Sequence, residues 1–287
     1  MFTDLSDVLF WTLFVSAPTM ATIHLGRHLG VLVLSQAMLS ASAALLFARV
    51  IGGTSNPWLA LALALVGSTL LGLLHFPILL CFGRGMTVIL TVIAQMVIQE
   101  FWLAAPAVTG GSGGILLATR WWAVPTATLA LITLLFAWRL VLRPPRPATT
   151  FDWPCLRHLG PHAGAFGVAA NRHYYTGFAL FGLVCGLVGV AATQLVGTLS
   201  IQSWGLSWPI TLLLIALLAY ESPFATTLTL ALIYSTLRIV FRQSIIASAL
   251  TSHLFELAFP LVLMIVYASR LTRFRAAEPP SYPTMPE

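Results

Sequence analysis

Long runs of apolar residues, separated by short polar or glycine- and proline-rich breaks, occupy most of this chain. The runs are continuous and do not alternate with polar residues, which favours membrane-spanning helices over a membrane β-barrel. The pattern therefore predicts an all-α fold, a polytopic membrane helix bundle with about eight or nine transmembrane segments of roughly 20 residues each. The first six predicted spans cover residues 8–25, 29–50, 58–80, 86–105, 121–142 and 174–196.

The pattern weakens in the last third of the chain. Residues 208–220 are apolar but too few to cross a membrane, and Glu221, Ser222 and Pro223 separate them from a second apolar run at 224–241. We expect a broken or re-entrant helix near 208–241, since non-helical backbone at membrane depth is tolerated where protein or a watery cavity surrounds it. A last span is predicted at 253–269.

A long polar insertion, residues 143–173, lies between the fifth and sixth predicted spans. We interpret residues 1–270 as one transmembrane domain that carries this insertion as a loop. The proline-rich stretch 271–287 is expected to be a disordered tail.

Composition agrees with this class of protein. Hydrophobic residues make up 59% of the 287 residues and charged residues 8%, whereas a soluble domain carries about a quarter charged residues. The sequence contains no lysine, which excludes a Walker A site and Schiff-base chemistry within this chain. His24 and His28 stand four residues apart, but two ligands alone make a poor metal site. We therefore expect neither an enzyme nor a chain that binds its own cofactor, and no nucleic-acid partner.

The arginines give an orientation. Cytoplasmic loops of membrane proteins carry an excess of basic residues. If the 143–173 loop is cytoplasmic, alternation of the spans places ten arginines on that side, the N-terminus outside and the C-terminus in the cytoplasm. The ten are Arg27, Arg84, Arg139, Arg143, Arg146, Arg157, Arg172, Arg270, Arg273 and Arg275.

Polar residues inside the predicted spans are the candidates for a solute pathway, because such groups are costly in a membrane and usually face a bundle interior or a cavity. Alternatives remain open. Interhelical hydrogen bonding is the alternative for Ser35, Gln36, Ser40 and Gln95, and an interfacial position is the alternative for Glu100. For Glu221 the alternative is a position near an aqueous face or pairing with Arg238 or Arg242. The candidates are Ser35, Gln36, Ser40, Gln95, Gln99, Glu100 and Glu221. Glycines 177, 182, 186 and 189 share small-residue faces in the sixth span and predict close helix packing.

Four blocks together resemble the membrane permeases of branched-chain amino acid type ABC importers, although the C-terminal third diverges. They are GVLVLSQAMLSASA at 30–43, PWLALALALVGSTLLG at 57–72, TVIAQ leading to TGGSGGI within 91–115, and AGAFGVAANRHYYTGFALFGLVCGLVG at 163–189. The resemblance implies a bacterial inner-membrane permease subunit for a branched-chain-like amino acid or a similar small polar solute.

Such permeases pair with a second permease copy or paralogue, bind separate ABC ATPases that use ATP, and receive solute from a periplasmic or extracellular binding protein. In this family a short helix of the cytoplasmic loop docks on the ATPase. Here it corresponds to residues 152–166, with Asp152 as N-cap, Leu156 and Leu159 as an apolar patch, a stop or kink at Gly160-Pro161, and Arg157 and Phe166 as further contacts. The alternative from another class is an ion-coupled secondary transporter that uses Glu221 or Glu100.

Overall fold

The computed structural model describes residues 2–111, 114–116, 149–199, 204–205, 207–220, 223–243 and 249–277, and nearly all of these are helical. By length and composition, five helical segments within these residues could each cross a membrane: Asp7–Leu29, Gln36–Thr54, Pro57–Ala104, Ala170–Val196 and Phe224–Phe241. The expectation of an all-α, membrane-embedded bundle is confirmed at this level. The number of spans stays a prediction, and the predicted span at 121–142 lies outside the described residues.

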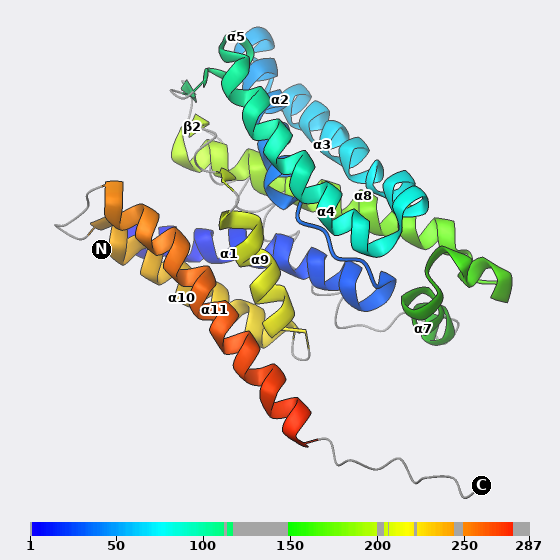
Figure 1. The fold of residues 1–287 in the computed structure, drawn as a ribbon. Coiled ribbons are helices and arrows are strands. Elements are labelled where there is room, and N and C mark those ends of the chain that lie inside the picture. The colour runs from blue at the N-terminus through cyan, green and yellow to red at the C-terminus, as the bar shows by residue number, and fades with distance from the viewer. Residues whose placement is uncertain are drawn as a thin grey trace, which may run out of the picture.

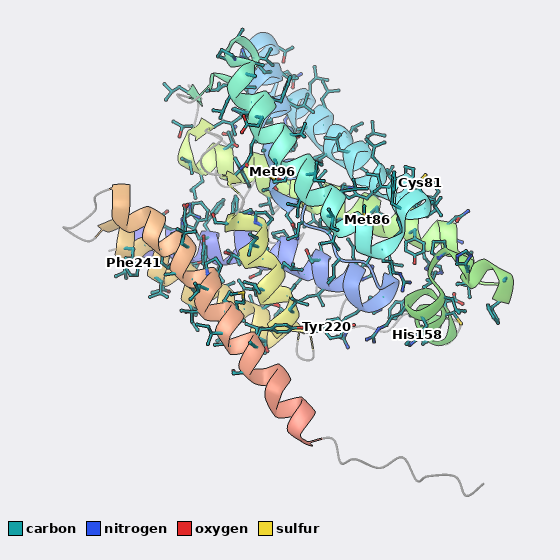
Figure 2. All side chains as sticks on the ribbon, viewed as in Figure 1. Cys81, Met86, Met96, His158, Tyr220 and Phe241 are labelled. Carbon is teal, nitrogen blue, oxygen red and sulfur yellow. The ribbon has the colours of Figure 1, made fainter. Side chains whose placement is uncertain are left out.

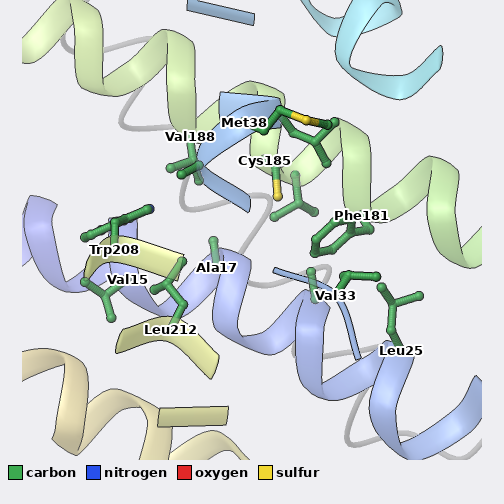
Figure 3. Close-up of a cluster of buried hydrophobic side chains, with 14 of the residues drawn as sticks. Val15, Ala17, Leu25, Val33, Met38, Phe181, Cys185, Val188, Trp208 and Leu212 are labelled. Carbon is green, nitrogen blue, oxygen red and sulfur yellow. The ribbon is translucent and has the colours of Figure 1, made fainter. Parts of the chain in front are cut away.

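Helix α1 (Phe2–His24) lies between two groups of helices (Figure 1). On one side are α2 (Gln36–Thr54), α3 (Pro57–Leu73), α4 (His75–Ala104) and α8 (Ala170–Val196). On the other side are α9 (Ser207–Leu218), α10 (Pro223–Gln243) and α11 (Ala249–Ala277). The hydrophobic core lies where α8 meets α1, and Figure 3 shows Phe181, Cys185 and Val188 of α8 in this region.

The first predicted boundary that fails is the start of the second span. Helix α1 continues as a π-helix, η1 (Leu25–Leu29), and ends at Gly30, whose φ of 66° lies in the left-handed region that glycine tolerates. Residues 30–35, hereafter the extended segment, are non-helical, although Val31 and Val33 are fully buried. The prediction of one continuous span over 29–50 is therefore wrong, since α2 begins only at Gln36.

Helices α2 and α3 meet at a turn that the sequence specifies locally. The Asn56 side-chain oxygen accepts from the backbone N–H groups of Trp58 and Leu59, and Pro57 occupies the first turn of α3. Helix α3 ends at Leu73 rather than near residue 80, and α4 begins at His75. The predicted break at 81–85 is a non-helical kink inside α4 at Gly83, with φ 74° and ψ 178°.

Glycines of α8 bring this helix close to its neighbours, as predicted. A Cβ on Gly182 would meet the backbone of Ser68, Thr69 and Gly72 in α3, and one on Gly186 would meet the Ser68 side chain. Gly189 lies against the backbone of Ser40 in α2, and Gly177 against Leu29 and Leu25. Their packing role is therefore confirmed most directly at Gly182 and Gly189, where a Cβ would meet the backbone of another helix.

The C-terminal third confirms a helix break near residue 220. Helix α9 has 12 residues, about 18 Å of helix, which is short of a hydrocarbon core of about 30 Å. It ends at Leu218, and α10 starts at Pro223. Helix α11 runs to Ala277 and so includes the first residues of the stretch 271–287, for which we expected a disordered tail; residues 278–287 lie outside the described residues.

Short elements complete the described chain. Helix α5 (Pro106–Thr109) follows α4, and strand β1 (Ile115–Leu116) pairs antiparallel with β2 (Thr198–Leu199), with Ile115 opposite Leu199. Helix α7 (Thr149–Leu159) continues into the 3₁₀-helix η3 (Gly160–Phe166). Helix α7 lies beside η1, at the end of α1, and η3 contacts α8 (Figure 1).

Candidate functional site

A buried polar cluster surrounds the junction of the extended segment and α2. The Ser35 hydroxyl lies 2.7 Å from Nε2 of His75, and Nδ1 of His75 lies 2.9 Å from the Gly72 carbonyl oxygen. A carbonyl oxygen can only accept, so Nδ1 carries a proton and, in the neutral ring, Nε2 accepts from Ser35. Both side chains are buried, so this pair holds the start of α2 against the start of α4.

Gln36, the first residue of α2, has the least satisfied side chain of this cluster. Its Nε2 donates to the Thr22 hydroxyl at 2.9 Å and to the Val33 carbonyl at 3.1 Å. Its Oε1 is buried, and no donor within the described residues reaches it. An unpaired buried acceptor costs about 1–3 kcal/mol. This oxygen is therefore an unsatisfied acceptor in the interior of the bundle.

Polar side chains recur at every fourth position along α4 on one face, which we call the polar line (Thr87, Thr91, Gln95 and Gln99). The Thr91 hydroxyl accepts from the Leu34 N–H of the extended segment at 3.1 Å. Nε2 of Gln95 and Nε2 of Gln99 both donate to the Trp204 carbonyl, at 3.1 and 3.2 Å. Thr87, Thr91 and Gln95 are buried, whereas apolar side chains on another face of α4, among them Met86 and Met96 (Figure 2), are exposed, so the polar line faces the bundle interior.

The structure separates the predicted pathway residues into groups. Ser35 and Gln36 come together with His75 and Thr22, while Gln95 and Gln99 belong to the polar line. Ser40 is buried and donates to the Cys185 carbonyl of α8 at 2.8 Å, which matches the alternative of interhelical hydrogen bonding. Glu100 is exposed near the end of α4, and Glu221 lies outside the described residues.

Sequence reasoning missed Thr22, His75, Thr87 and Thr91. A usable signal existed for two of them, because Thr87 and Thr91 precede Gln95 by eight and four residues and so share its helix face. His75 and Thr22 gave no such signal, since only the fold brings them to α2.

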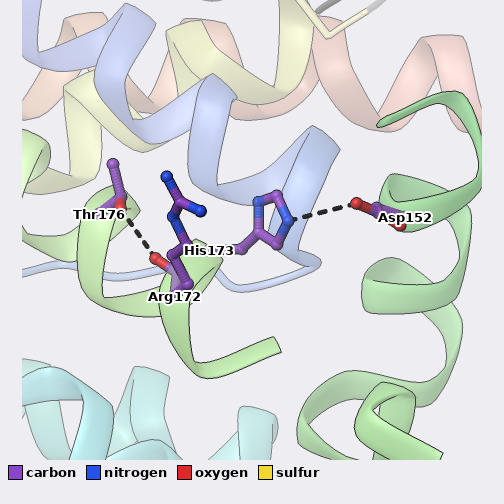
Figure 4. Close-up of polar contacts among 4 residues, drawn as sticks. All are labelled: Asp152, Arg172, His173 and Thr176. Atoms are coloured by element: carbon purple, nitrogen blue, oxygen red, sulfur yellow. Dashed lines mark hydrogen bonds and ion pairs between the residues drawn. The ribbon is translucent and has the colours of Figure 1, made fainter. Parts of the chain in front are cut away.

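The α7–η3 segment corresponds to the predicted docking helix, with corrections. Asp152 is not an N-cap, because α7 already begins at Thr149; its carboxylate instead lies 3.4 Å from Nε2 of His173 at the start of α8 (Figure 4). Leu156 is 0% exposed and belongs to the chain's own core, so it does not contribute to an exposed patch. Leu159 and Phe166 are 39% and 60% exposed, and Arg157 is exposed as well.

One arginine, Arg84 of α4, links this segment to the end of α1. Its Nη2 donates to the carbonyls of Leu156 and, at 3.2 Å, Leu29, and its Nη1 donates to the Arg157 carbonyl at 2.5 Å. The Tyr174 hydroxyl donates to the Leu29 carbonyl at 3.2 Å and lies 3.5 Å from the Leu156 carbonyl. The ring of Trp153 packs on that of His28 with centroids 3.5 Å apart. The α7–η3 segment is thus fixed to η1 by hydrogen bonds and by ring packing.

Three of the arginines that the charge rule assigns to one side lie near one another, and two arginines outside that set lie elsewhere. The guanidinium carbons of Arg27 and Arg157 lie 5.9 and 5.6 Å from the Tyr220 ring centroid, close to the contacts of Arg84. Arg49 instead donates to the carbonyls of Ala107 and Val108 beside α5, and Arg238 lies 3.9 Å from the Trp11 ring.

No protein-family model, curated protein or solved structure matches this chain. The family resemblance therefore depends on the four sequence blocks alone. In the structure these blocks are neighbours: the first includes Ser35 and Gln36, the second Ser68 and Gly72, the third Thr91 and Gln95, and the fourth Gly182 and Gly186.

Proposed function

We propose that this chain is a membrane-embedded permease subunit of an ATP-binding cassette importer, which forms the path for an amino acid or a similar small polar solute. The observation that carries the proposal is the discontinuity between α1 and α2, buried among polar side chains. Transporters often build solute sites from broken helices near the middle of the membrane, where freed backbone groups and helix ends meet the solute. Residues 30–35, the unpaired Gln36 Oε1 and the polar line of α4 support the proposal of such a site here.

The chain moves solute without chemistry of its own in this proposal. The ATP-hydrolysing subunits are separate proteins, and the α7–η3 segment is where they dock, with Leu159 and Phe166 as exposed apolar contacts. The end of the bundle with Arg27, Arg84 and Arg157 faces the cytoplasm by the charge rule. Binding of ATP between two ATPases would then pull on this segment and bias the bundle between two packed states.

An ion-coupled secondary transporter is the alternative. It needs an ionisable side chain in the path. Glu100 is exposed at the end of α4, outside the buried cluster, which leaves Glu221 as the candidate for coupling. A transport rate that follows an imposed ion gradient, and loses this dependence in Glu221→Gln, would favour the alternative.

The test is purification of the tagged full chain from its native membrane with its associated proteins, followed by ATPase assay and solute uptake in vesicles. We expect an ATPase to co-purify with the wild-type chain and to be lost in Leu159→Asp and in Phe166→Asp. Leu116→Asp is the matched control, because Leu116 is also an exposed apolar residue, 79% accessible, but lies in β1. Absence of any ATPase, with uptake that survives both changes and ATP depletion, contradicts the proposal.

A further inference from the structure

We propose that Arg84 is a positioning residue that joins the α7–η3 segment to the extended segment, so that the two shift together. The functional consequence rests on the proposed function: displacement of α7–η3 by an ATPase reaches the buried polar cluster through this side chain. The joint movement of the two segments is a property of this chain and does not depend on a bound ATPase.

The carbonyl oxygens that accept hydrogen bonds from Arg84 lie at helix ends and have no donor within their own helices. Leu156 and Arg157 lie in the last turn of α7, where carbonyls lack intrahelical donors and carry the negative end of the helix dipole. The residue four positions after Arg157 is Pro161, which has no N–H to donate. Leu29 is the last residue of η1, directly before the extended segment. A single guanidinium therefore completes the ends of two helices from different parts of the chain.

Two glycines make room for this side chain. Gly30 and Gly160 both have left-handed backbones, with φ of 66° and 65°. A Cβ on Gly30 would lie 3.1 Å from the Arg84 guanidinium carbon and 3.0 Å from the Arg157 carbonyl oxygen, and one on Gly160 would lie 3.2 Å from Arg84 Nη2. The guanidinium thus lies against both glycines, one at the start of the extended segment and one at the end of α7.

The extended segment connects the hydrogen bonds of Arg84 to the candidate site. Gly30 is its first residue and Ser35 its last, and Ser35 and Gln36 make the contacts with His75 and Thr22. Its backbone is held at the start by hydrogen bonds from Gly30 and Val31 to the Leu25 carbonyl of η1, and further along by the Thr91 hydroxyl, which accepts from the Leu34 N–H. A shift of Leu29 relative to α4 therefore moves the groups that would meet the solute.

Arginine is required here by its geometry. A planar guanidinium offers five donors in a fixed fork and can reach three carbonyls at once, whereas a lysine ammonium is a compact charge on a flexible stem. Arg84→Lys keeps the charge and loses the fork, so it separates the two contributions. Arg49→Gln is the matched control for Arg84→Gln, because Arg49 likewise donates to two backbone carbonyls, those of Ala107 and Val108, in another part of the bundle.

The experiment is amide hydrogen exchange of the full chain in lipid nanodiscs, followed by mass spectrometry. In Arg84→Gln we expect exchange to rise about tenfold or more both in peptides covering residues 28–36 and in those covering 155–166. Arg84→Lys should show the same pattern. Arg49→Gln should raise exchange near residues 105–110 and leave both segments as in the wild type. Faster exchange in 155–166 alone, or in neither segment, overturns the proposal.

Peptides from α8, residues 170–196, report whether each variant folds. If Arg84→Gln does not fold, Tyr174→Phe replaces it: the hydroxyl that supports the same carbonyls is lost, while the ring keeps its packing against Phe76 and Phe178. We expect hydrogen exchange to rise in both segments, by less than in Arg84→Gln. A rise confined to one segment overturns the proposal.

A second measurement separates this inference from the proposed function. In the complex with its ATPase, Arg84→Gln should still bind the ATPase and hydrolyse ATP but move less solute per ATP hydrolysed, whereas Arg49→Gln should not change that ratio. If Arg84→Gln raises hydrogen exchange in both segments of a chain that binds no ATPase, the link through Arg84 is upheld and the importer proposal is refuted. If Arg84→Gln moves as much solute per ATP hydrolysed as the wild type, the role of Arg84 in coupling is refuted while the importer proposal stands.

Discussion

Replacement of Gln36 by leucine tests whether the buried polar cluster serves a solute or the fold. The two side chains have similar volumes, so the change removes polar atoms while it largely preserves packing. It deletes the donors to the Thr22 hydroxyl and the Val33 carbonyl, and also the unpaired Oε1. Thr22 keeps its own bond to the Pro18 carbonyl, at 2.8 Å.

The opposing terms nearly cancel in the free energy of unfolding. Hydrogen bonds inside membrane bundles average about 0.6 kcal/mol, so two lost bonds cost roughly 1 kcal/mol. The buried Val33 carbonyl then lacks its donor, which costs about 1–3 kcal/mol, and removal of the unpaired Oε1 regains a similar amount. We expect a net change within about 1–2 kcal/mol and therefore a small shift of the melting temperature. Uptake should fall about tenfold or more, because one hydrogen bond to the solute, about 1.4 kcal/mol, is lost.

The assay pairs thermal unfolding in detergent with uptake in reconstituted vesicles. Ser40→Ala is the control, since Ser40 is buried one turn further along α2 and bonds the Cys185 carbonyl. It should lower stability by about 0.6–1.7 kcal/mol and leave uptake unchanged. A Gln36→Leu protein that melts far earlier yet transports normally would show that the cluster is structural, which refutes the reasoning.

Two further predictions concern packing and docking. Gly182→Ala should destabilise the bundle by about 1–3 kcal/mol in thermal unfolding, because its Cβ meets backbone atoms of α3, whereas Gly52→Ala, with no heavy atom within 4 Å, should be neutral or slightly stabilising; equal melting temperatures would contradict the close packing. Leu156→Asp should unfold the region around α7, because Leu156 is fully buried. Phe166→Asp should leave hydrogen exchange in α7 unchanged and abolish only ATPase binding. Loss of hydrogen-exchange protection in both variants would place Phe166 inside the fold.

Local signals predicted much of the architecture. The stop of α7 at Gly160 and the break after α9 were both predicted, and each depends on a few adjacent residues with fixed conformational preferences. The spacing of Gly182 and Gly186 likewise predicted a close helix contact, because a small-residue face has the same effect whichever helix it meets.

The extended segment could not be predicted in this way. Its residues after Gly30 are all apolar up to Ser35, so hydropathy alone favours a continuous helix. What stabilises the non-helical backbone comes from distant positions: Thr91 accepts from the Leu34 N–H, and Gln36 donates to the Val33 carbonyl. Since a helix and an extended chain have the same composition here, only the tertiary partners decide between them.

The same limit applies to the candidate site and explains what sequence could and could not give. Ser35 and Gln36 stood out because polar groups are rare in an apolar run, but their partners His75 and Thr22 belong to other segments. From the sequence, Arg84 contributed only a positive charge to the predicted orientation, and Pro161 only predicted the end of a helix. In the structure these two facts are connected, because the stop leaves the Arg157 carbonyl without a helical donor and Arg84 supplies one. A residue pattern that ends a helix thus also creates an acceptor by which that helix is held, and this hydrogen bond adds to the contacts that Trp153 and Asp152 make earlier in α7.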